Sequence, residues 1–189
     1  VSNGNVLVSD GLEVEDVERL GARAKCAPPI RTAPHVEQLW EAIRKGQVDT
    51  IGSDHSPAPP DMKENADFFA AWGGVAGVQS TLSSLLTREP YLPLDRVVAM
   101  TSTNVASRFR VKKKGQIAPG FDADLTLVDV DACFTLTREM LLDRYKLSPY
   151  VGREFRGFVK RTLVRGQTVF ADGKIVSKPI GQLMTPEAA

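Results

Sequence analysis

The segment Ser53-Asp54-His55-Ser56-Pro57 carries the residue types best suited to chemistry in this sequence. It directly follows a β-prone run at 48–52, and parallel α/β folds gather active-site groups just past the carboxyl ends of their strands. A carboxylate at such a position can bind a divalent metal and accept a proton from metal-bound water, whose pKa the metal lowers to about 7. Asp54 is therefore a candidate metal ligand and general base. The competing interpretation is that Asp54 caps the following turn, as Asp and Ser before Pro often do.

The polar neighbours of Asp54 do not complete a catalytic set. Asp54, His55 and Ser56 are not a hydrolase triad, because triad members converge from separated positions while neighbours in extended chain point to opposite sides. Two interpretations of His55 stay open, contact with substrate and a local hydrogen bond within its loop. His35, at a predicted helix start, is expected on the surface. A catalytic zinc takes three protein ligands, so two histidines are too few for a conventional binuclear centre.

The elements that must position Asp54 follow an α/β pattern. Val36, Leu39, Trp40 and Ile43 fall at i, i+3, i+4 and i+7, which predicts an amphipathic helix closed by Lys45-Gly46. A helix, a glycine turn, a strand and a polar loop form one repeat of a fold built on a parallel sheet. Further helices are predicted over 13–20, 78–86 and 95–109, and a strand with a loop over 22–31. Cys26, at the end of that strand, is expected to be a small buried thiol.

The pattern changes after Lys112-Lys113-Lys114-Gly115. A strand is predicted over 123–130. The runs at 158–169 and 174–176 are interpreted as a hairpin around Asp172-Gly173, which is a typical tight-turn pair. We therefore divide the chain into an α/β part at 1–110 and a smaller β-rich module at 111–189.

The overall composition is that of an ordinary globular protein. The chain has 189 residues, 42% of them hydrophobic, and a formal charge of +1. This apolar content argues against a disordered tail, and the balanced charge argues against a nucleic-acid or membrane-surface partner. No apolar run approaches the roughly 18 residues of a spanning helix. Two cysteines suit a reducing compartment, so the expected location is the cytoplasm.

Several segments together resemble allantoinases, which belong to the cyclic amidohydrolases with hydantoinases, dihydropyrimidinases and dihydroorotases. The Gly-Ser-Asp-His-Ser-Pro stretch at 52–57 and the Ile-Ala-Pro-Gly-Phe-Asp-Ala-Asp stretch at 117–124 are shared by many of these relatives. The Trp-Gly-Gly run at 72–74 and the Ser-Pro-Tyr-Val-Gly run at 148–152 favour allantoinases, as does the order of these motifs after Lys-Cys-Ala-Pro-Pro-Ile-Arg at 25–31. The resemblance extends from about Asp16 to Gly181.

The resemblance implies an α/β fold, namely the C-terminal part of a metal-dependent (β/α)8 amidohydrolase barrel followed by a small β-sandwich module. It implies two divalent metals, usually zinc, bridged by a carbamylated lysine, and hydrolysis of the hydantoin ring of allantoin to allantoate. Asp54 matches the aspartate of the eighth strand, a metal ligand and the general base. The backbone at Ala27 and Gly73 matches positions that hold the substrate ring. His55 and Ser56 match positions that line the opening of the same substrate site. The resemblance also implies a homo-oligomer, commonly a tetramer.

The sequence departs from this pattern in its metal ligands. It contains no His-x-His pair, and its only histidines are His35 and His55. A complete barrel needs about 250 residues, so we expect this chain to be the C-terminal part of a longer protein and to be inactive alone. Two alternatives stay open. One is a hydantoinase or dihydropyrimidinase type of cyclic amidase, and the other is a non-enzymatic scaffold that keeps the amidohydrolase barrel.

Overall fold

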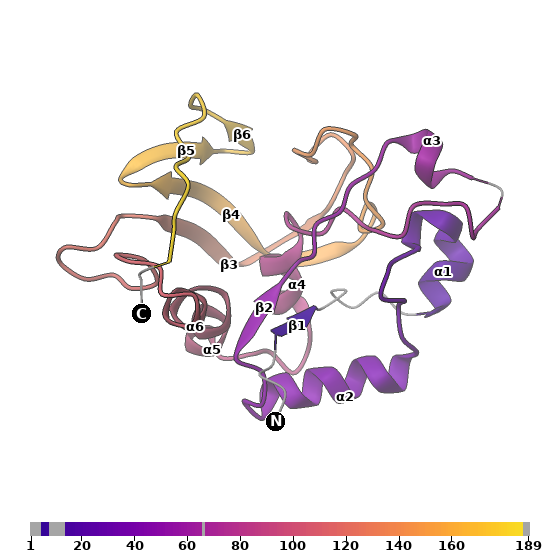
Figure 1. Cartoon of the computed structure of the whole chain (residues 1–189), viewed down its shortest axis with the longest axis horizontal. Helices are drawn as coiled ribbons and strands as arrows, with labels where there is room; N and C mark the ends of the chain where they lie inside the picture. Colours follow the sequence, from indigo (N-terminus) through magenta and orange to yellow (C-terminus); the bar gives the residue numbers. More distant parts are fainter. Residues whose placement is uncertain (1–4, 8–13, 66, 187–189) are drawn as a thin grey trace.

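The computed structural model describes residues 5–7, 14–65 and 67–186 (Figure 1). A four-stranded sheet occupies one side of the molecule, and two short parallel strands with most of the helices occupy the rest. The strands are β1 (Asn5–Leu7), β2 (Thr50–Gly52), β3 (Leu125–Thr135), β4 (Glu154–Val164), β5 (Gln167–Ala171) and β6 (Lys174–Ile175). The helices are α1 (Val14–Leu20), α2 (Ala33–Arg44), α3 (Pro60–Lys63), α4 (Thr81–Thr87), α5 (Leu94–Val98) and α6 (Asn104–Arg108).

The predicted helix–turn–strand unit is confirmed by α2 and β2. Helix α2 begins at Ala33-Pro34, where the missing proline N–H would have no partner in a helix anyway. Its buried face consists of Val36, Trp40 and Ile43, which pack in a cluster with residues of α4 and α5. Strand β2 pairs with β1 in parallel, with Val6 opposite Ile51. The sequence pattern thus correctly indicated a parallel α/β arrangement.

Residues 94–108 form one continuous helical stretch, as the sequence predicted for 95–109. Between α5 and α6 lies a π-helical segment, Ala99–Thr103, in which i→i+5 hydrogen bonds replace the α-helical pattern. Met100, at the centre of the stretch, is fully buried in the hydrophobic cluster that contains Trp40 and Ile43 of α2. The helix predicted over 13–20 is α1, although Glu13 lies outside the described residues.

The strand expected within 22–31 is absent from the described structure, and this part of the prediction is wrong. Gly21–Ala24 forms a 3-10 helix, and an irregular segment follows it. The backbone carbonyl of Lys25 accepts a hydrogen bond from the Lys63 ammonium group at 2.9 Å rather than from a neighbouring strand. A lysine at the end of helix α3 thus takes the place of the expected ladder partner.

The β-rich region is an antiparallel sheet in the order β3-β4-β5-β6. The predicted hairpin at Asp172-Gly173 is confirmed, since both residues have positive φ and join β5 to β6. The predicted continuous strand over 158–169 is wrong, because Arg165-Gly166, also with positive φ, turns the chain between β4 and β5. Arginine rarely adopts this conformation, but here the Arg165 N–H donates to Asp124 Oδ1 at 2.7 Å.

Helix α4 joins the two regions by packing on β4. The buried Ser83 hydroxyl donates to the Gly157 carbonyl at 2.8 Å. Gly157 has φ +88°, and a Cβ there would stand 3.2 Å from Leu86 Cβ. The strand therefore approaches the helix at a distance that only glycine permits. The division of the chain at 110 and 111 stays a prediction.

Candidate functional site

Asp54 lies just beyond the carboxyl end of β2, as the sequence predicted. Its backbone has φ +43° and its side chain is exposed. Within the described ranges no group donates a hydrogen bond to its carboxylate, so Asp54 does not cap the turn that follows it. Positive φ outside glycine is uncommon but tolerated best by Asp and Asn. The carboxylate is therefore held at a strand end with both oxygens open to a ligand.

Two other segments of the predicted site lie in direct contact. A Cβ built on Gly73 would stand 3.2 Å from Ala27 Cβ and 3.7 Å from the Ala27 nitrogen. Glycine at position 73 thus lets the two backbones approach closely. The backbones of Ala27 and Gly73, far apart in sequence, thus lie side by side.

Ser56 connects the Asp54 segment to the Trp72-Gly73 segment. Its N–H donates to the Val75 carbonyl at 2.9 Å, and its hydroxyl oxygen accepts a hydrogen bond from the indole N–H of Trp72 at 3.1 Å. One residue is thus bonded through both its backbone and its side chain to the 72–75 segment. Ser56 thereby fixes the spacing between the segment that follows β2 and the segment that carries Gly73.

His55 forms a local hydrogen bond. The Val78 N–H donates to its Nδ1 at 3.3 Å, and the ring is exposed. This contact ties the segment after β2 to the start of the α4 region. It engages one ring nitrogen only, so contact of the other nitrogen with a ligand stays a prediction.

Cys26 lies near Asp54 and is only partly buried. Burial raises the pKa of its thiol, and the negative charge of Asp54 raises it further. Cys26 was expected to be a small buried thiol, and the structure buries it only in part. The reason is that Cys26 follows the 3-10 helix into the open site and not a strand into the core.

Lys63 is a site residue that the sequence reasoning missed. Its side chain is 3% exposed, and burial lowers the pKa of its ammonium group to about 8. It donates to the carbonyls of Lys25 and Trp72, both at 2.9 Å. No sequence signal could have found it, because its partners are backbone carbonyls, which every residue has.

The described residues fit a metal ion only in part. An open carboxylate oxygen of Asp54 is a suitable ligand for a divalent cation. Among residues 14–65 and 67–186, however, no three His, Cys, Asp or Glu side chains gather where they could hold a metal ion. One ligand is too few for a catalytic zinc, so any metal beside Asp54 needs ligands from outside this part of the chain.

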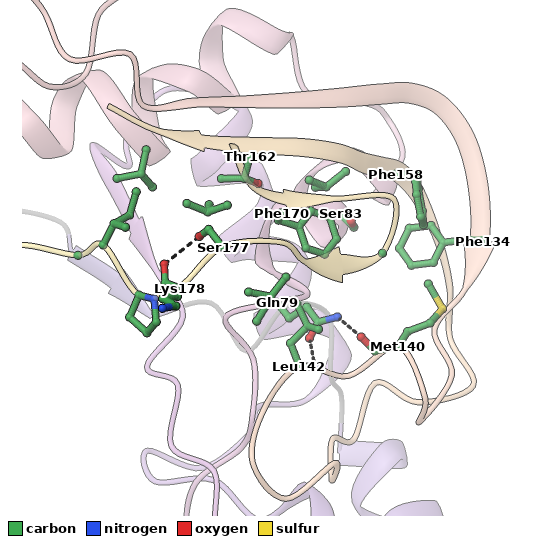
Figure 2. A pocket seen from close by; sticks show the side chains of 18 residues that line it. Gln79, Ser83, Phe134, Met140, Leu142, Phe158, Thr162, Phe170, Ser177 and Lys178 are labelled. Carbon is green, nitrogen blue, oxygen red and sulfur yellow. Dashed lines mark hydrogen bonds between the residues drawn. The ribbon is translucent and has the colours of Figure 1, made fainter. Parts of the chain in front are cut away.

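Among the cavities of the described structure, two border the β3–β6 sheet. One, of about 600 Å³, is bounded by Phe134, Phe158 and Phe170 and by the C-terminal segment around Lys178 (Figure 2). Figure 2 also shows Gln79, another residue that lines it, with hydrogen bonds to the Met140 carbonyl and from the Leu142 N–H. The other, of about 1020 Å³, lies between the 94–108 helical stretch and β3. Neither of these two cavities is lined by Asp54.

The fold and this strand-end carboxylate define the class of the protein. The Amidohydrolase family model matches residues 5–169, and the chain belongs to that family. Over 176 residues it is 50% identical to an allantoinase of Rubrobacter xylanophilus, and over 177 residues it is 49% identical to one of Solibacter usitatus. Each match covers 92% of this chain. The chain spans 39% of the length of each of these relatives.

Solved structures agree with this assignment. An L-hydantoinase (dihydropyrimidinase) from Arthrobacter aurescens superposes with a TM-score of 0.87 at 32% identity, covering 92% of this chain and 40% of that one. A further D-hydantoinase structure gives a TM-score of 0.80 at 30% identity, covering 89% of this chain and 39% of that one. In the described part of this chain, no helix is both long and apolar enough to cross a membrane.

Proposed function

We propose that this chain is part of an enzyme that hydrolyses one amide of the hydantoin ring of allantoin to give allantoate. Identity of 50% to an allantoinase supports the choice of substrate. The observation that carries the proposal is Asp54, whose exposed carboxylate accepts no hydrogen bond from the described residues and stands where β2 ends. A carboxylate in that position has the chemistry of a metal ligand and of a base.

The proposal includes a complete (β/α)8 barrel and a β-sandwich in the full-length protein. The parallel β1–β2 pair would supply strands of the barrel, and the β3-β4-β5-β6 sheet would supply one layer of the sandwich. The hydantoinase superposition supports this architecture, because it matches this chain to 40% of a longer chain. The apolar cavity against β4–β6 (Figure 2) is then a surface that the remaining layer covers.

The proposed chemistry assigns a role to each residue of the site. Asp54 would ligate a divalent metal and accept the proton of the attacking water, then deliver it to the leaving ring nitrogen. The bound metal, which we propose to be a zinc pair, supplies water of lowered pKa and polarises the amide carbonyl. The peptide groups of Ala27 and Gly73 would hold the ring, and His55 and Ser56 would line the mouth. The other ligands, including a carbamylated lysine, would come from outside this chain.

The test uses a hybrid enzyme, in which the matched 176 residues of this chain replace the aligned segment of the Rubrobacter xylanophilus allantoinase. We expect the hybrid to retain metal and to turn over allantoin faster than hydantoin or dihydrouracil. The unaltered relative serves as the control. A folded, metal-loaded hybrid that opens dihydrouracil but not allantoin would contradict the proposal.

The chain of 189 residues is expected to be inactive alone, because one metal ligand does not make a site. Turnover of allantoin by this polypeptide with retained metal would contradict that expectation. For the full-length protein we propose a homo-oligomer, commonly a tetramer in this family, which light scattering of the hybrid would test.

A hydantoinase or dihydropyrimidinase activity is the second candidate. The superposition on hydantoinase structures favours it, and the same substrate panel separates it from the first. A non-enzymatic scaffold would leave Asp54 without a task, and the hybrid would then show no turnover of any cyclic amide.

A further inference from the structure

Lys63 lies between the two backbone segments that form the proposed substrate edge. Its ammonium group donates to the Lys25 carbonyl and to the Trp72 carbonyl, each at 2.9 Å. Trp72 directly precedes Gly73, and Lys25 lies two residues before Ala27. The Lys63 side chain therefore connects the two irregular segments immediately beside the Ala27–Gly73 contact.

Lys25 makes the reciprocal connection. Its own ammonium group donates to the carbonyls of Phe69 and Ala71, at 2.8 Å and 2.7 Å. The Trp72 N–H also donates to the Met62 carbonyl at 2.9 Å. The end of helix α3 and the 69–72 segment are thus attached to Lys25 by lysine–carbonyl hydrogen bonds from both sides.

The Lys63 contact differs from an ordinary ion pair. Within the described residues its ammonium group pairs with no carboxylate, and its side chain is almost fully buried. Burying an ammonium group is costly unless its donors are satisfied, and two fixed carbonyls satisfy two of its three donors. By contrast, Arg23 and Glu64, which lie close by in the chain, form an exposed ion pair, a kind of contact that contributes little to stability.

We propose that Lys63 is a positioning residue, whose bonds to the Lys25 and Trp72 carbonyls set the distance between the substrate-holding peptide groups of Ala27 and Gly73. This inference rests on the proposed function. It assigns Lys63 no contact with substrate. Lys63 would affect the substrate ring only through the two backbone segments that it joins. Such an effect can be large, because a misplacement of substrate-positioning groups by about 1 Å can cost about a hundredfold in catalysis.

The experiment compares the hybrid enzyme with its Lys63→Met, Lys63→Arg and Arg23→Gln variants. The measurements are kcat and KM for allantoin, metal content, and amide hydrogen exchange of peptides covering 24–28 and 71–75. For Lys63→Met we expect a KM raised about tenfold, a smaller change in kcat, faster exchange in both peptides and unchanged metal content. Lys63→Arg retains hydrogen-bond donors and should therefore have a KM close to the native value. Arg23→Gln, the matched control, should leave all values unchanged.

Two results would overturn the inference. One is a folded Lys63→Met variant with the native KM and native exchange, and the other is an equal rise of KM in Arg23→Gln. If the native hybrid does not turn over allantoin, the proposed function fails, and hydrogen exchange alone decides on Lys63. If Lys63→Met does not fold, Lys63→Gln, which retains a donor of shorter reach, replaces it in both measurements.

Discussion

Gly74 lies directly against Ser56: a Cβ built on Gly74 would stand 2.6 Å from Ser56 Cβ and 2.8 Å from the Ser56 carbonyl oxygen. Real Cβ atoms do not approach other atoms so closely. The backbone at Ser56, just after Asp54, and the backbone at Gly74, just after Gly73, are therefore in direct contact. Because Ser56 also bonds to Trp72 and Val75, any displacement at Gly74 moves both sides of the site.

Gly74→Ala is expected to destabilise the hybrid enzyme by about 1–3 kcal/mol, as overpacking typically does. The obstacle is partly backbone, which cannot rotate away. Gly52→Ala is the matched control, because a Cβ at Gly52 meets nothing within 4 Å. Urea unfolding of both variants measures the difference. Equal stabilities for the two variants would contradict the close packing.

Asp54→Asn is expected to lower kcat of the hybrid for allantoin by at least about a thousandfold, since it removes both a ligand and a base. Asp49, exposed at the opposite end of β2, provides the control, and Asp49→Asn should retain the native rate. Steady-state kinetics and metal analysis check both variants. Retention of the native rate by Asp54→Asn would remove the basis of the proposed mechanism.

Ser83→Ala is expected to lower the free energy of unfolding by about 1–3 kcal/mol, because the buried Gly157 carbonyl loses its donor. The neighbouring Ser84 hydroxyl is buried without any hydrogen-bond partner in the described structure. Ser84→Ala should therefore be neutral or stabilising. Thermal unfolding of the two variants compares a satisfied with an unsatisfied hydroxyl on the same helix, and a larger loss for Ser84→Ala would refute the assignment.

The buried Lys63 should make stability depend on pH. Its pKa is about 8 in the folded chain, against 10.5 for an exposed lysine such as the unfolded chain presents. Between these values the unfolded state binds more protons, so the free energy of unfolding rises with pH. Below about pH 8 the cost of burying the charge is fully present. Relative to Lys63→Met, the native hybrid should gain stability as pH rises through this window. A difference that stays flat, measured by urea unfolding, would contradict the buried ammonium.

The deprotonated amine of Lys63 would still have two N–H groups for its two carbonyls. The hydrogen bonds from Lys63 to the Lys25 and Trp72 carbonyls should therefore persist at high pH. Hydrogen exchange of the 71–75 peptide, corrected for the intrinsic pH dependence of exchange, should show the same protection on both sides of the transition.

Cys26 should react slowly with iodoacetamide, because burial and the nearby Asp54 charge both raise the pKa of its thiol. Cys133 is exposed and should be alkylated first. In the metal-free hybrid, Asp54→Asn should accelerate alkylation of Cys26 while leaving Cys133 unchanged, as residue-resolved mass spectrometry can show. Identical Cys26 rates in both proteins would place the carboxylate too far away to act on the thiol.

The sequence predicted elements whose signal is local. The stripe of Val36, Trp40 and Ile43 predicted α2, because burial of one helical face repeats every three to four residues. Asp172-Gly173 predicted a hairpin because both residues readily adopt positive φ. The turn at Arg165-Gly166 was missed, although Gly166 is a local turn signal, and the Arg165 N–H there donates to the distant carboxylate of Asp124.

By itself, the sequence determined that an Asp directly follows a buried strand, because adjacent residues set this placement, and the proposed chemistry starts from it. It also determined the membership in a family, which the motif order indicated. Only the tertiary structure decided how Ala27, Ser56 and Gly73 meet and that Lys63 joins their segments. The physical reason is that most of these contacts have a backbone atom as one partner, which every residue carries, so the partners are fixed only when the chain is packed.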